Sequence, residues 1–223
     1  MNAKQVAAEH AVKLIKDGMT VGIGTGSTSE FAIEAIGNRI KEGLSITGVA
    51  SSLRSEELAR NAGIRLIAFS KVETIDIYID GADEVDRDLN LIKGGGGALL
   101  REKILAFHSK EFIVIVDNSK LVTHLGTFPL PVELVPFAME LTMRQLEKLC
   151  CTTALRQSNN KNYITDNGNT IVDCDFKKIE DVDWLHNSVN AIPGVVENGL
   201  FPKKMISKIL VGFESGDVQI INK

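Results

Sequence analysis

The sequence predicts an α/β protein in which a parallel-sheet domain is joined to a second, smaller α+β domain of ferredoxin-like order. Short apolar runs alternate with amphipathic helical segments through residues 1–120, a pattern typical of a parallel sheet covered by helices on both faces. Three prolines then fall within the eight residues that end at Pro136, where the chain changes character. Beyond them the predicted order is helix, two or more strands, helix and strand, which with one preceding strand gives β-α-β-β-α-β.

The larger domain is expected to open with a helix over residues 3–17, capped by Asn2 and ended by Gly18, because its apolar residues recur at helical spacing. The following elements are strand 19–23, a glycine and hydroxyl loop 22–29, a helix through 31–40, strand 46–49, loop 50–52, a helix to about 61, strands 64–68 and 75–80, a helix around 98–107 and strand 112–116. Strands that alternate with helices in this way pair in parallel.

The proline-containing run Phe128–Pro136 is expected to be an edge strand or a linker, because proline cannot donate to a sheet ladder. The smaller domain would contain strand 132–135, helix 137–149, strand 152–156, strands around Tyr163 and Ile171 joined by a turn at 166–169, a helix near 181–189 and strand 195–200. The runs 209–213 and 218–221 are apolar enough to rejoin the first sheet, which makes the smaller domain an insertion. The predicted domains are 1–128 plus 203–223, and 129–202.

The composition is that of one or two globular domains and excludes several partners. Of 223 residues, 44% are hydrophobic and 24% charged, and the basic residues are scattered over a chain of net charge −4, so nucleic acid is not expected. No apolar run approaches a membrane span and the N-terminus has no apolar signal region, so no membrane partner is expected. Cys150, Cys151 and Cys174 lack metal-ligand spacing, which indicates free thiols in the cytoplasm.

The loop from Gly22 to Thr28 lies between a predicted strand and a predicted helix, where free N–H groups and the helix dipole favour an anion such as phosphate. It is a poor dinucleotide fingerprint, because Ser27 occupies the position of the third glycine. The hydroxyls of Thr25, Ser27 and Thr28 could bind phosphate oxygens. The alternative is a glycine turn with an ordinary Ser or Thr cap.

The segment 80–103 concentrates acids, lysines and glycines after a buried strand. Asp80 and Asp83 fall at the carboxyl end of that strand, where open α/β sheets bind ligands, and Glu102 lies one turn into the next helix. The three carboxylates can therefore converge. Taken singly, each acid is also explained as a turn cap, a solvated side chain or the partner of a surface lysine.

Lys93 and the four glycines that follow it separate these acids. Four consecutive glycines cost folding entropy and indicate close approach of the backbone to a ligand, with N–H groups and a positive charge available to an oxyanion. A metal site is the competing use of clustered carboxylates, but only His108 is nearby and Lys93 would oppose a cation. Lys120 follows another strand end and could neutralise phosphate; Lys4 is a weaker candidate for the same role.

These groups suit proton transfer next to a sugar carbonyl, which requires a carboxylate base and donors for an enediolate oxygen. Five motifs resemble ribose-5-phosphate isomerase type A: residues 24–28, 80–84, 92–96, 101–103 and 117–120. The resemblance implies a Rossmann-like domain plus a small α+β domain, interconversion of D-ribose 5-phosphate and D-ribulose 5-phosphate in the non-oxidative pentose phosphate pathway, no metal or organic cofactor, and a homodimer or homotetramer.

Carried over onto this sequence, the resemblance implies individual roles. Glu102 resembles the base that moves a proton between C1 and C2, Asp80 and Asp83 resemble acids that hold the sugar hydroxyls, and Asp80 is also the candidate for ring opening. Lys93 resembles the residue that stabilises the enediolate. The implied substrate-binding residues are Thr25, Gly26, Ser27, Thr28, Asp80, Gly81, Ala82, Asp83, Lys93, Gly94, Gly95, Gly96 and Lys120. Gly97 departs from the family, which often has Ala there.

Two other functions fit parts of this pattern. A sugar-phosphate sensor of a transcriptional regulator would need a DNA-binding module, and the opening helix leaves no room for a helix-turn-helix. An acyl-CoA transferase or a sugar-phosphate deaminase of similar architecture is the third possibility, the former requiring a glutamate nucleophile and a groove for CoA.

Overall fold

The computed structural model describes residues 1–223, and the chain forms two compact units. Unit 1 comprises residues 1–82, 101–120 and 204–223, and unit 2 comprises residues 83–100 and 121–203. Compared with the predicted domains, residues 83–100 and 121–128 group with the smaller unit. Within that unit the Glu84 carboxylate accepts hydrogen bonds from the N–H groups of Gly126 (2.7 Å) and Phe128 (2.6 Å), which ties these two segments together.

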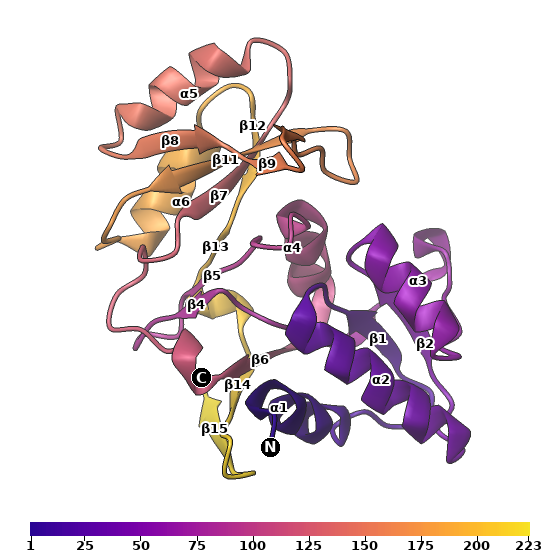
Figure 1. Cartoon of the computed structure of the whole chain (residues 1–223). Helices are drawn as coiled ribbons and strands as arrows, with labels where there is room; N and C mark the ends of the chain where they lie inside the picture. The colour runs from indigo at the N-terminus through magenta and orange to yellow at the C-terminus, as the bar shows by residue number, and fades with distance from the viewer. The chain divides into compact units, whose positions relative to one another are not determined.

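Unit 1 is built on a six-stranded sheet with the order β15-β14-β6-β3-β1-β2 (Figure 1). Its strands are β1 (Thr20–Ile23), β2 (Thr47–Ala50), β3 (Ile75–Asp80), β6 (Ser109–Asp117), β14 (Lys208–Gly212) and β15 (Val218–Asn222). All neighbours pair in parallel except β14 and β15, which are antiparallel. The predicted parallel sheet, and the return of the two C-terminal runs to it, are confirmed.

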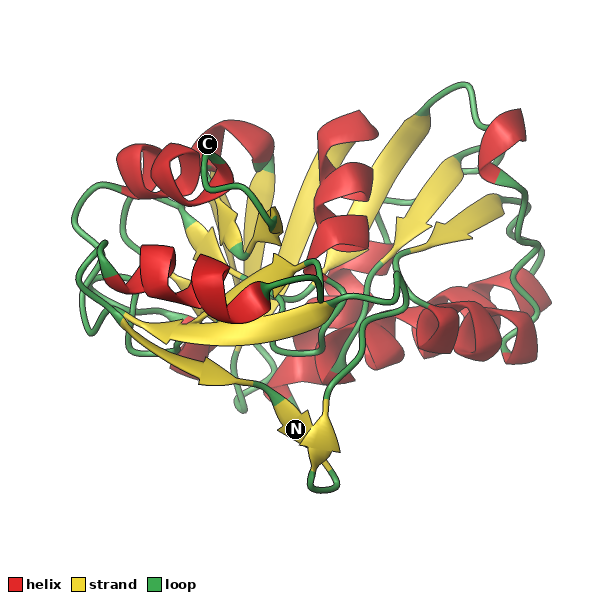
Figure 2. Cartoon of the chain, turned by 90° about the horizontal axis from the view of Figure 1, so that it is seen from above, coloured by secondary structure: helices red, strands yellow, loops and turns green.

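Alternate residues of each strand point to opposite faces of this sheet, and helices pack against it. The helices of this part of the chain are α1 (Ala3–Val12), α2 (Ser27–Lys41), α3 (Leu53–Asn61) and α4 (Leu99–His108). Ile77, Ile79 and Ile113 belong to the core formed with α1 and α2, which run side by side (Figures 1 and 2). Tyr78 and Phe112 lie at even-numbered positions, whereas these isoleucines lie at odd-numbered ones. The two rings stack on each other with centroids 4.9 Å apart. The odd and even positions of β3 therefore serve different faces.

The first helix ends earlier than predicted, at Val12 rather than at residue 17. Its N-cap is confirmed, since the Asn2 side chain accepts from the N–H of Lys4 at 3.1 Å. Beyond Val12 the carbonyls are satisfied from another helix: Nη1 of Arg39, in α2, donates to the Val12 carbonyl (2.6 Å) and to that of Ile15 (2.9 Å). The Val12 carbonyl also accepts from the N–H of Ile15 at 3.1 Å, so Arg39 adds a charged donor at the point where the helix ends.

The strand predicted over residues 64–68 is wrong. Only one bridge forms there, between Gly48 and Leu66, with the N–H of Gly48 donating to Arg65 and that of Ile67 donating back to Gly48. The chain then leaves the sheet edge for a short 3-10 turn, Phe69–Lys71. Its residues therefore touch the sheet at one point rather than extending it.

Unit 2 contains a four-stranded antiparallel sheet with the order β12-β7-β11-β8. Its elements are β7 (Leu130–Leu134), α5 (Met139–Glu147), β8 (Thr152–Leu155), β11 (Thr170–Asp175), α6 (Val182–Asn190) and β12 (Val195–Asn198). The predicted ferredoxin-like order is confirmed. Two smaller pieces were not predicted: a hairpin of β9 (Gln157–Ser158) and β10 (Lys161–Asn162), and a sheet of β4 (Glu84–Val85), β5 (Leu91–Ile92) and β13 (Leu200–Phe201).

The expectation of an edge strand or linker at 128–136 is also wrong, because β7 is an interior strand with neighbours on both sides. Of the three prolines only Pro131 lies within it, at the second residue, and the Pro131 carbonyl still accepts from the N–H of Gly199 (2.8 Å). Pro129 and Pro136 lie outside the strand. A proline near the start of a strand therefore removes one donor without ending the pairing.

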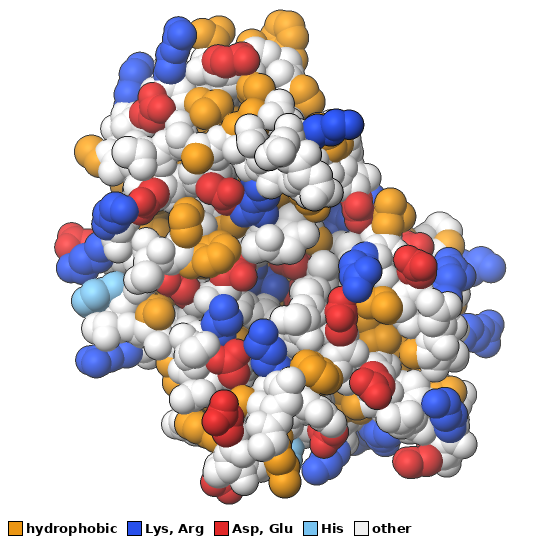
Figure 3. All heavy atoms as spheres, viewed as in Figure 1, with side chains coloured by type: hydrophobic (Ala, Val, Ile, Leu, Met, Phe, Trp, Pro, Cys, Tyr) orange, Lys and Arg blue, Asp and Glu red, His pale blue; other side chains and the backbone are white.

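None of the helices combines the length and apolar character needed to cross a bilayer. The surface drawn in Figure 3 carries Lys and Arg side chains interspersed with Asp and Glu, as the scattered basic residues of the sequence predict.

Replacing Arg39 with Met should lower the free energy of unfolding by about 1–3 kcal/mol, because two carbonyls at the end of α1 lose a charged donor. Urea denaturation measures this change. Lys41→Met is the matched control, since the exposed Lys41 makes only a 3.4 Å contact with Asn38. An Arg39 variant as stable as the control would show that water satisfies these carbonyls equally well.

Candidate active site

The predicted site residues fall into two groups, one in each unit. Unit 1 carries Thr25, Gly26, Ser27, Thr28, Asp80, Gly81, Ala82, Glu102 and Lys120, and unit 2 carries Asp83, Lys93, Gly94, Gly95 and Gly96. Each group is organised by hydrogen bonds within its own unit.

Asp80 is the most heavily bonded carboxylate of the first group. It ends β3, its side chain is fully buried, and its Oδ1 accepts from the N–H of Thr25 (3.0 Å), the hydroxyl of Ser29 (2.8 Å) and the N–H of Gly81 (2.8 Å). Its Oδ2 accepts from the hydroxyl of Tyr78. The orientation of the carboxylate is therefore fixed from several sides.

Gly24 shows how closely the backbone approaches this carboxylate. A Cβ atom at Gly24 would lie 2.0 Å from Oδ1 of Asp80, which no side chain could tolerate. The glycine after β1 therefore allows the loop to sit against the end of β3.

Tyr78 shares a face of β3 with Asp80 because the two residues are separated by one position. Its hydroxyl donates to Oδ2 of Asp80. Burial, followed by the negative charges of Asp80 and Glu102, raises the pKa of Tyr78 well above its usual range. Tyr78 thus stays protonated and remains a donor to Asp80.

Glu102 lies in the first turn of α4, and its side chain is only 2% exposed. Its charge acts on Tyr78, as that of Asp80 does, so the structure brings two buried acids to one tyrosine. Lys103, the next residue, is also buried. The sequence predicted that Asp80, Asp83 and Glu102 would converge, and of these Asp80 and Glu102 belong to this unit. It gave no role to Tyr78, whose signal is that it lies two positions before Asp80 and so points to the same face of the strand.

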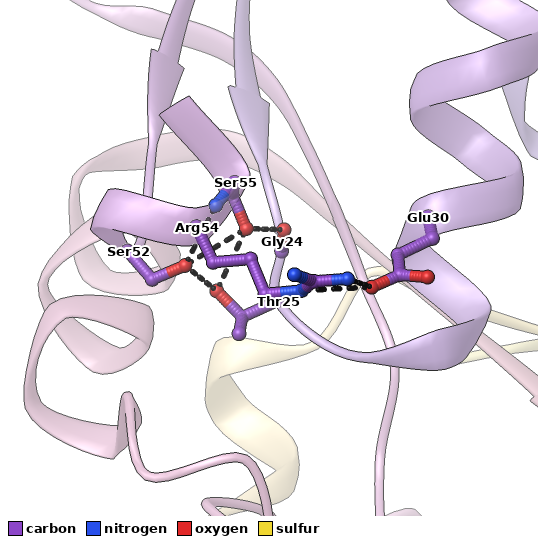
Figure 4. Close-up of polar contacts among 6 residues, drawn as sticks. All are labelled: Gly24, Thr25, Glu30, Ser52, Arg54 and Ser55. Atoms are coloured by element: carbon purple, nitrogen blue, oxygen red, sulfur yellow. Dashed lines mark hydrogen bonds and ion pairs between the residues drawn. The ribbon is translucent and has the colours of Figure 1, made fainter. Parts of the chain in front are cut away.

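The hydroxyl of Thr25 is engaged within the protein (Figure 4). In Figure 4 its Oγ1 meets Oγ of Ser52 (2.8 Å) and Oγ of Ser55 (3.0 Å). The same atom also lies 2.8 Å from Oγ of Ser51. Ser55 in turn donates to the carbonyl of Gly24 at 2.7 Å. Thr25 therefore holds the turn after β1 against the start of α3, a role that the sequence analysis did not foresee for its side chain.

The start of α2 is the remaining anion-binding feature of the loop. Gly26 is its N-cap, with φ of 107° and no side-chain cap, and Nζ of Lys4 in α1 donates to Oγ of Ser27 at 3.0 Å. Uncapped N–H groups beside a lysine suit a phosphate. Thr28 is half-buried close to Gly81, and Lys120, in the 3-10 turn after β6, is half-buried as well.

In unit 2, Asp83 directly precedes β4 and Lys93 directly follows β5, the strand that pairs with β4. The Oδ2 atom of Asp83 accepts from the N–H of Gly95 at 2.8 Å. The Lys93 side chain is 2% exposed, and its Nζ lies 5.5 Å from the centre of the Phe201 ring, a cation–π contact. The N–H of Lys93 donates to the carbonyl of Gly199 at 2.9 Å. The lysine is thus fixed at the entrance to the glycine loop.

Three kinds of comparison identify related proteins. The family model for ribose 5-phosphate isomerase A (phosphoriboisomerase A) matches residues 47–216. The chain is 50% identical over 217 residues to ribose-5-phosphate isomerase A of Bacillus mycoides, covering 97% of this chain and 98% of that one. It is 48% identical over 214 residues to the Streptococcus agalactiae protein of the same name, covering 96% of each.

Solved structures agree over the full length. Ribose 5-phosphate isomerase A from Methanocaldococcus jannaschii is 44% identical with a TM-score of 0.94, covering 100% of this chain and 99% of that one. A D-ribose-5-phosphate isomerase in complex with phospho-erythronic acid is 39% identical with a TM-score of 0.95, covering 100% of both chains. These matches confirm the fold class and the resemblance seen in the sequence motifs. The chain belongs to the ribose 5-phosphate isomerase A family.

Proposed function

We propose that this chain interconverts D-ribose 5-phosphate and D-ribulose 5-phosphate through an enediolate, as a step of the non-oxidative pentose phosphate pathway. Family membership supports the reaction, and a relative binds phospho-erythronic acid, whose planar carboxylate resembles the reacting end of an enediolate. The observation that carries the chemistry is the pair of buried carboxyls, Asp80 and Glu102, that act on Tyr78. A proton-transfer site needs such carboxyls shielded from water.

Glu102 is the proposed base. It removes the proton from C2 of the opened aldose and returns it to C1, while a proton moves from the C2 hydroxyl to the carbonyl oxygen at C1. The intermediate bears negative charge on these oxygens, and Lys93 with the N–H groups of Gly94 to Gly96 is proposed to stabilise it. Because Glu102 is 2% exposed, little water competes for its proton.

Asp80 and Asp83 are proposed to hold the sugar hydroxyls, with Asp80 also assisting opening of the furanose ring. Gly81 and Ala82 would lie along the sugar. The phosphate is assigned to Gly26, Ser27 and Thr28 at the start of α2 and to Lys120. Thr25 belongs to this loop as the residue that fixes its shape, because its hydroxyl is already bonded to serines.

A homodimer or homotetramer in the cytoplasm completes the proposal. Unit 2 exposes large apolar side chains, among them Phe137 (88%), Leu141 (58%) and Trp184 (56%), which favours association with another copy. The three cysteines are free thiols, which suits a reducing compartment.

Replacing Glu102 with Gln should lower kcat by about 10²–10⁴, with substrate still bound, because the amide cannot accept the C2 proton. Conversion of ribose 5-phosphate to ribulose 5-phosphate measures the rate. Glu34→Gln, on the exposed side of α2, is the matched control and should retain full activity. A Glu102→Gln enzyme as fast as this control would remove Glu102 from the mechanism.

Replacing Tyr78 with Phe should slow the conversion of cyclic ribose 5-phosphate about tenfold more than it slows exchange of the C1 proton of ribulose 5-phosphate with D₂O. The ketose cannot close a furanose ring because O5 carries the phosphate, so its exchange bypasses ring opening. The variant removes a donor to Asp80 while keeping the stack on Phe112. NMR follows both reactions, and equal slowing would show that Asp80 acts after ring opening.

Exhaustive treatment with EDTA should leave the isomerase rate unchanged within about 20%, because Lys93 and backbone N–H groups supply the proposed charge stabilisation. No group of three or more His, Cys, Asp or Glu side chains is arranged to hold a metal ion. The rate is measured before and after chelation, and again after adding Mg²⁺ or Zn²⁺. Loss of activity that a divalent ion restores would replace this scheme with a metal-assisted one.

A further inference from the structure

The carbonyl groups of Gly94, Gly95 and Gly96 accept hydrogen bonds from side chains of unit 2. Nη1 of Arg156 donates to the Gly94 carbonyl at 2.7 Å and to the Gly95 carbonyl at 3.2 Å. The hydroxyl of Tyr163 donates to the Gly96 carbonyl at 3.3 Å. Two side chains that are more than fifty positions further along the sequence therefore hold three consecutive peptide groups.

Arg156 is itself held rigidly. It follows β8, and its Nε donates to Oδ2 of Asp173 at 3.0 Å while Nη2 donates to Oδ1, a bidentate pair with a residue of the neighbouring strand β11. The side chains are only 13% and 25% exposed. Since one edge of the guanidinium is fixed on Asp173, its remaining nitrogen has a defined direction toward the loop.

The bonds to the carbonyls determine where the N–H groups point. In a trans peptide the C=O and the following N–H are antiparallel, and the chain has no cis peptide bond. The N–H groups of Gly95 and Gly96 therefore point away from Arg156. For Gly95 the consequence is visible, because its N–H donates to Oδ2 of Asp83 at 2.8 Å. Within the loop, the N–H of Gly97 donates to the Gly94 carbonyl at 3.0 Å, whereas the Gly95 carbonyl is held by Arg156. A run of glycines has no Cβ atoms to restrict rotation of its peptide planes, so Arg156 adds restraint to this turn.

Resting on the proposed function, we propose that Arg156 is a positioning residue that fixes the peptide planes after Gly94 and Gly95, so that the Gly95 N–H holds Asp83 and the Gly96 N–H receives the enediolate oxygen. Asp173 orients Arg156 for this task. Arg156 does not touch the substrate; it acts through the loop.

Tyr163 contributes at the far end of the same loop. A Cβ atom at Gly97 would lie 2.2 Å from the Tyr163 hydroxyl, and Gly97 has φ of +83°. The glycine at this position, where the family often has Ala, leaves space for Tyr163 to reach the Gly96 carbonyl. The loop of this chain is therefore matched to the side chain that holds it.

The test compares Arg156→Met with the full-length wild-type chain. We expect kcat to fall about 10- to 100-fold with KM changed less than about threefold, because a preorganised oxyanion donor is lost rather than a substrate contact. Affinity for phospho-erythronic acid should fall about tenfold, while that for ribitol 5-phosphate, which has no carbonyl or carboxylate, changes less than about twofold. Arg144→Met, on the exposed side of α5, is the matched control and should leave all four quantities unchanged.

Equal loss of affinity for both ligands would indicate a general structural role and overturn the proposal, as would an unchanged kcat. If Arg156→Met does not fold, Asp173→Asn provides the second variant, since it keeps the shape of the pair and weakens its hold on Arg156. The same selective loss is expected there to a smaller degree, and its absence would contradict the proposal. A wild-type chain that does not convert ribose 5-phosphate would instead refute the proposed function itself.

Discussion

The buried carboxylate of Asp80 organises the first unit. Burying a charge is costly unless hydrogen bonds compensate it, and here donors from Thr25, Ser29, Tyr78 and Gly81 surround the two oxygens. These donors come from three places: the turn after β1, the start of α2 and β3 itself. A single side chain thus joins the loop after β1 to the end of β3, and Gly24 is required because nothing larger fits against this side chain.

The two units use the same principle on different atoms. In the first, an acid is fixed by backbone and hydroxyl donors, and burial, followed by the charges of Asp80 and Glu102, keeps Tyr78 protonated. In the second, peptide carbonyls are fixed by a guanidinium, so that the N–H groups are oriented without any bond of their own to the clamp. Both arrangements fix the orientation of polar groups before a substrate binds. Groups oriented in advance stabilise developing charge without having to reorganise.

Much of this was predictable from local patterns, and the rest depended on contacts distant in sequence. Strand-end positions of Asp80 and Asp83 follow from the apolar run before them, and Glu102 follows from helical spacing. Nothing near Arg156 signals its contact with Gly94, because the two residues lie 62 positions apart in the sequence. The interior position of β7 was missed because the prolines argued against an interior strand. A proline removes only its own N–H donor, and the other residues of β7 still pair with β11 on one side and β12 on the other.

The sheet of the first unit also constrains how the chain acquires its structure. Ile209 of β14 pairs with Val114 of β6, so residues 121–203 of the second unit are synthesised between two strands that lie next to each other. Closing such a long loop has an entropic cost, and parallel pairing over this sequence separation is slow. During translation, β6 therefore presents an open edge until the final segment emerges from the ribosome. Residues 204–223, which contain β14 and β15, complete a sheet whose first strand is β1.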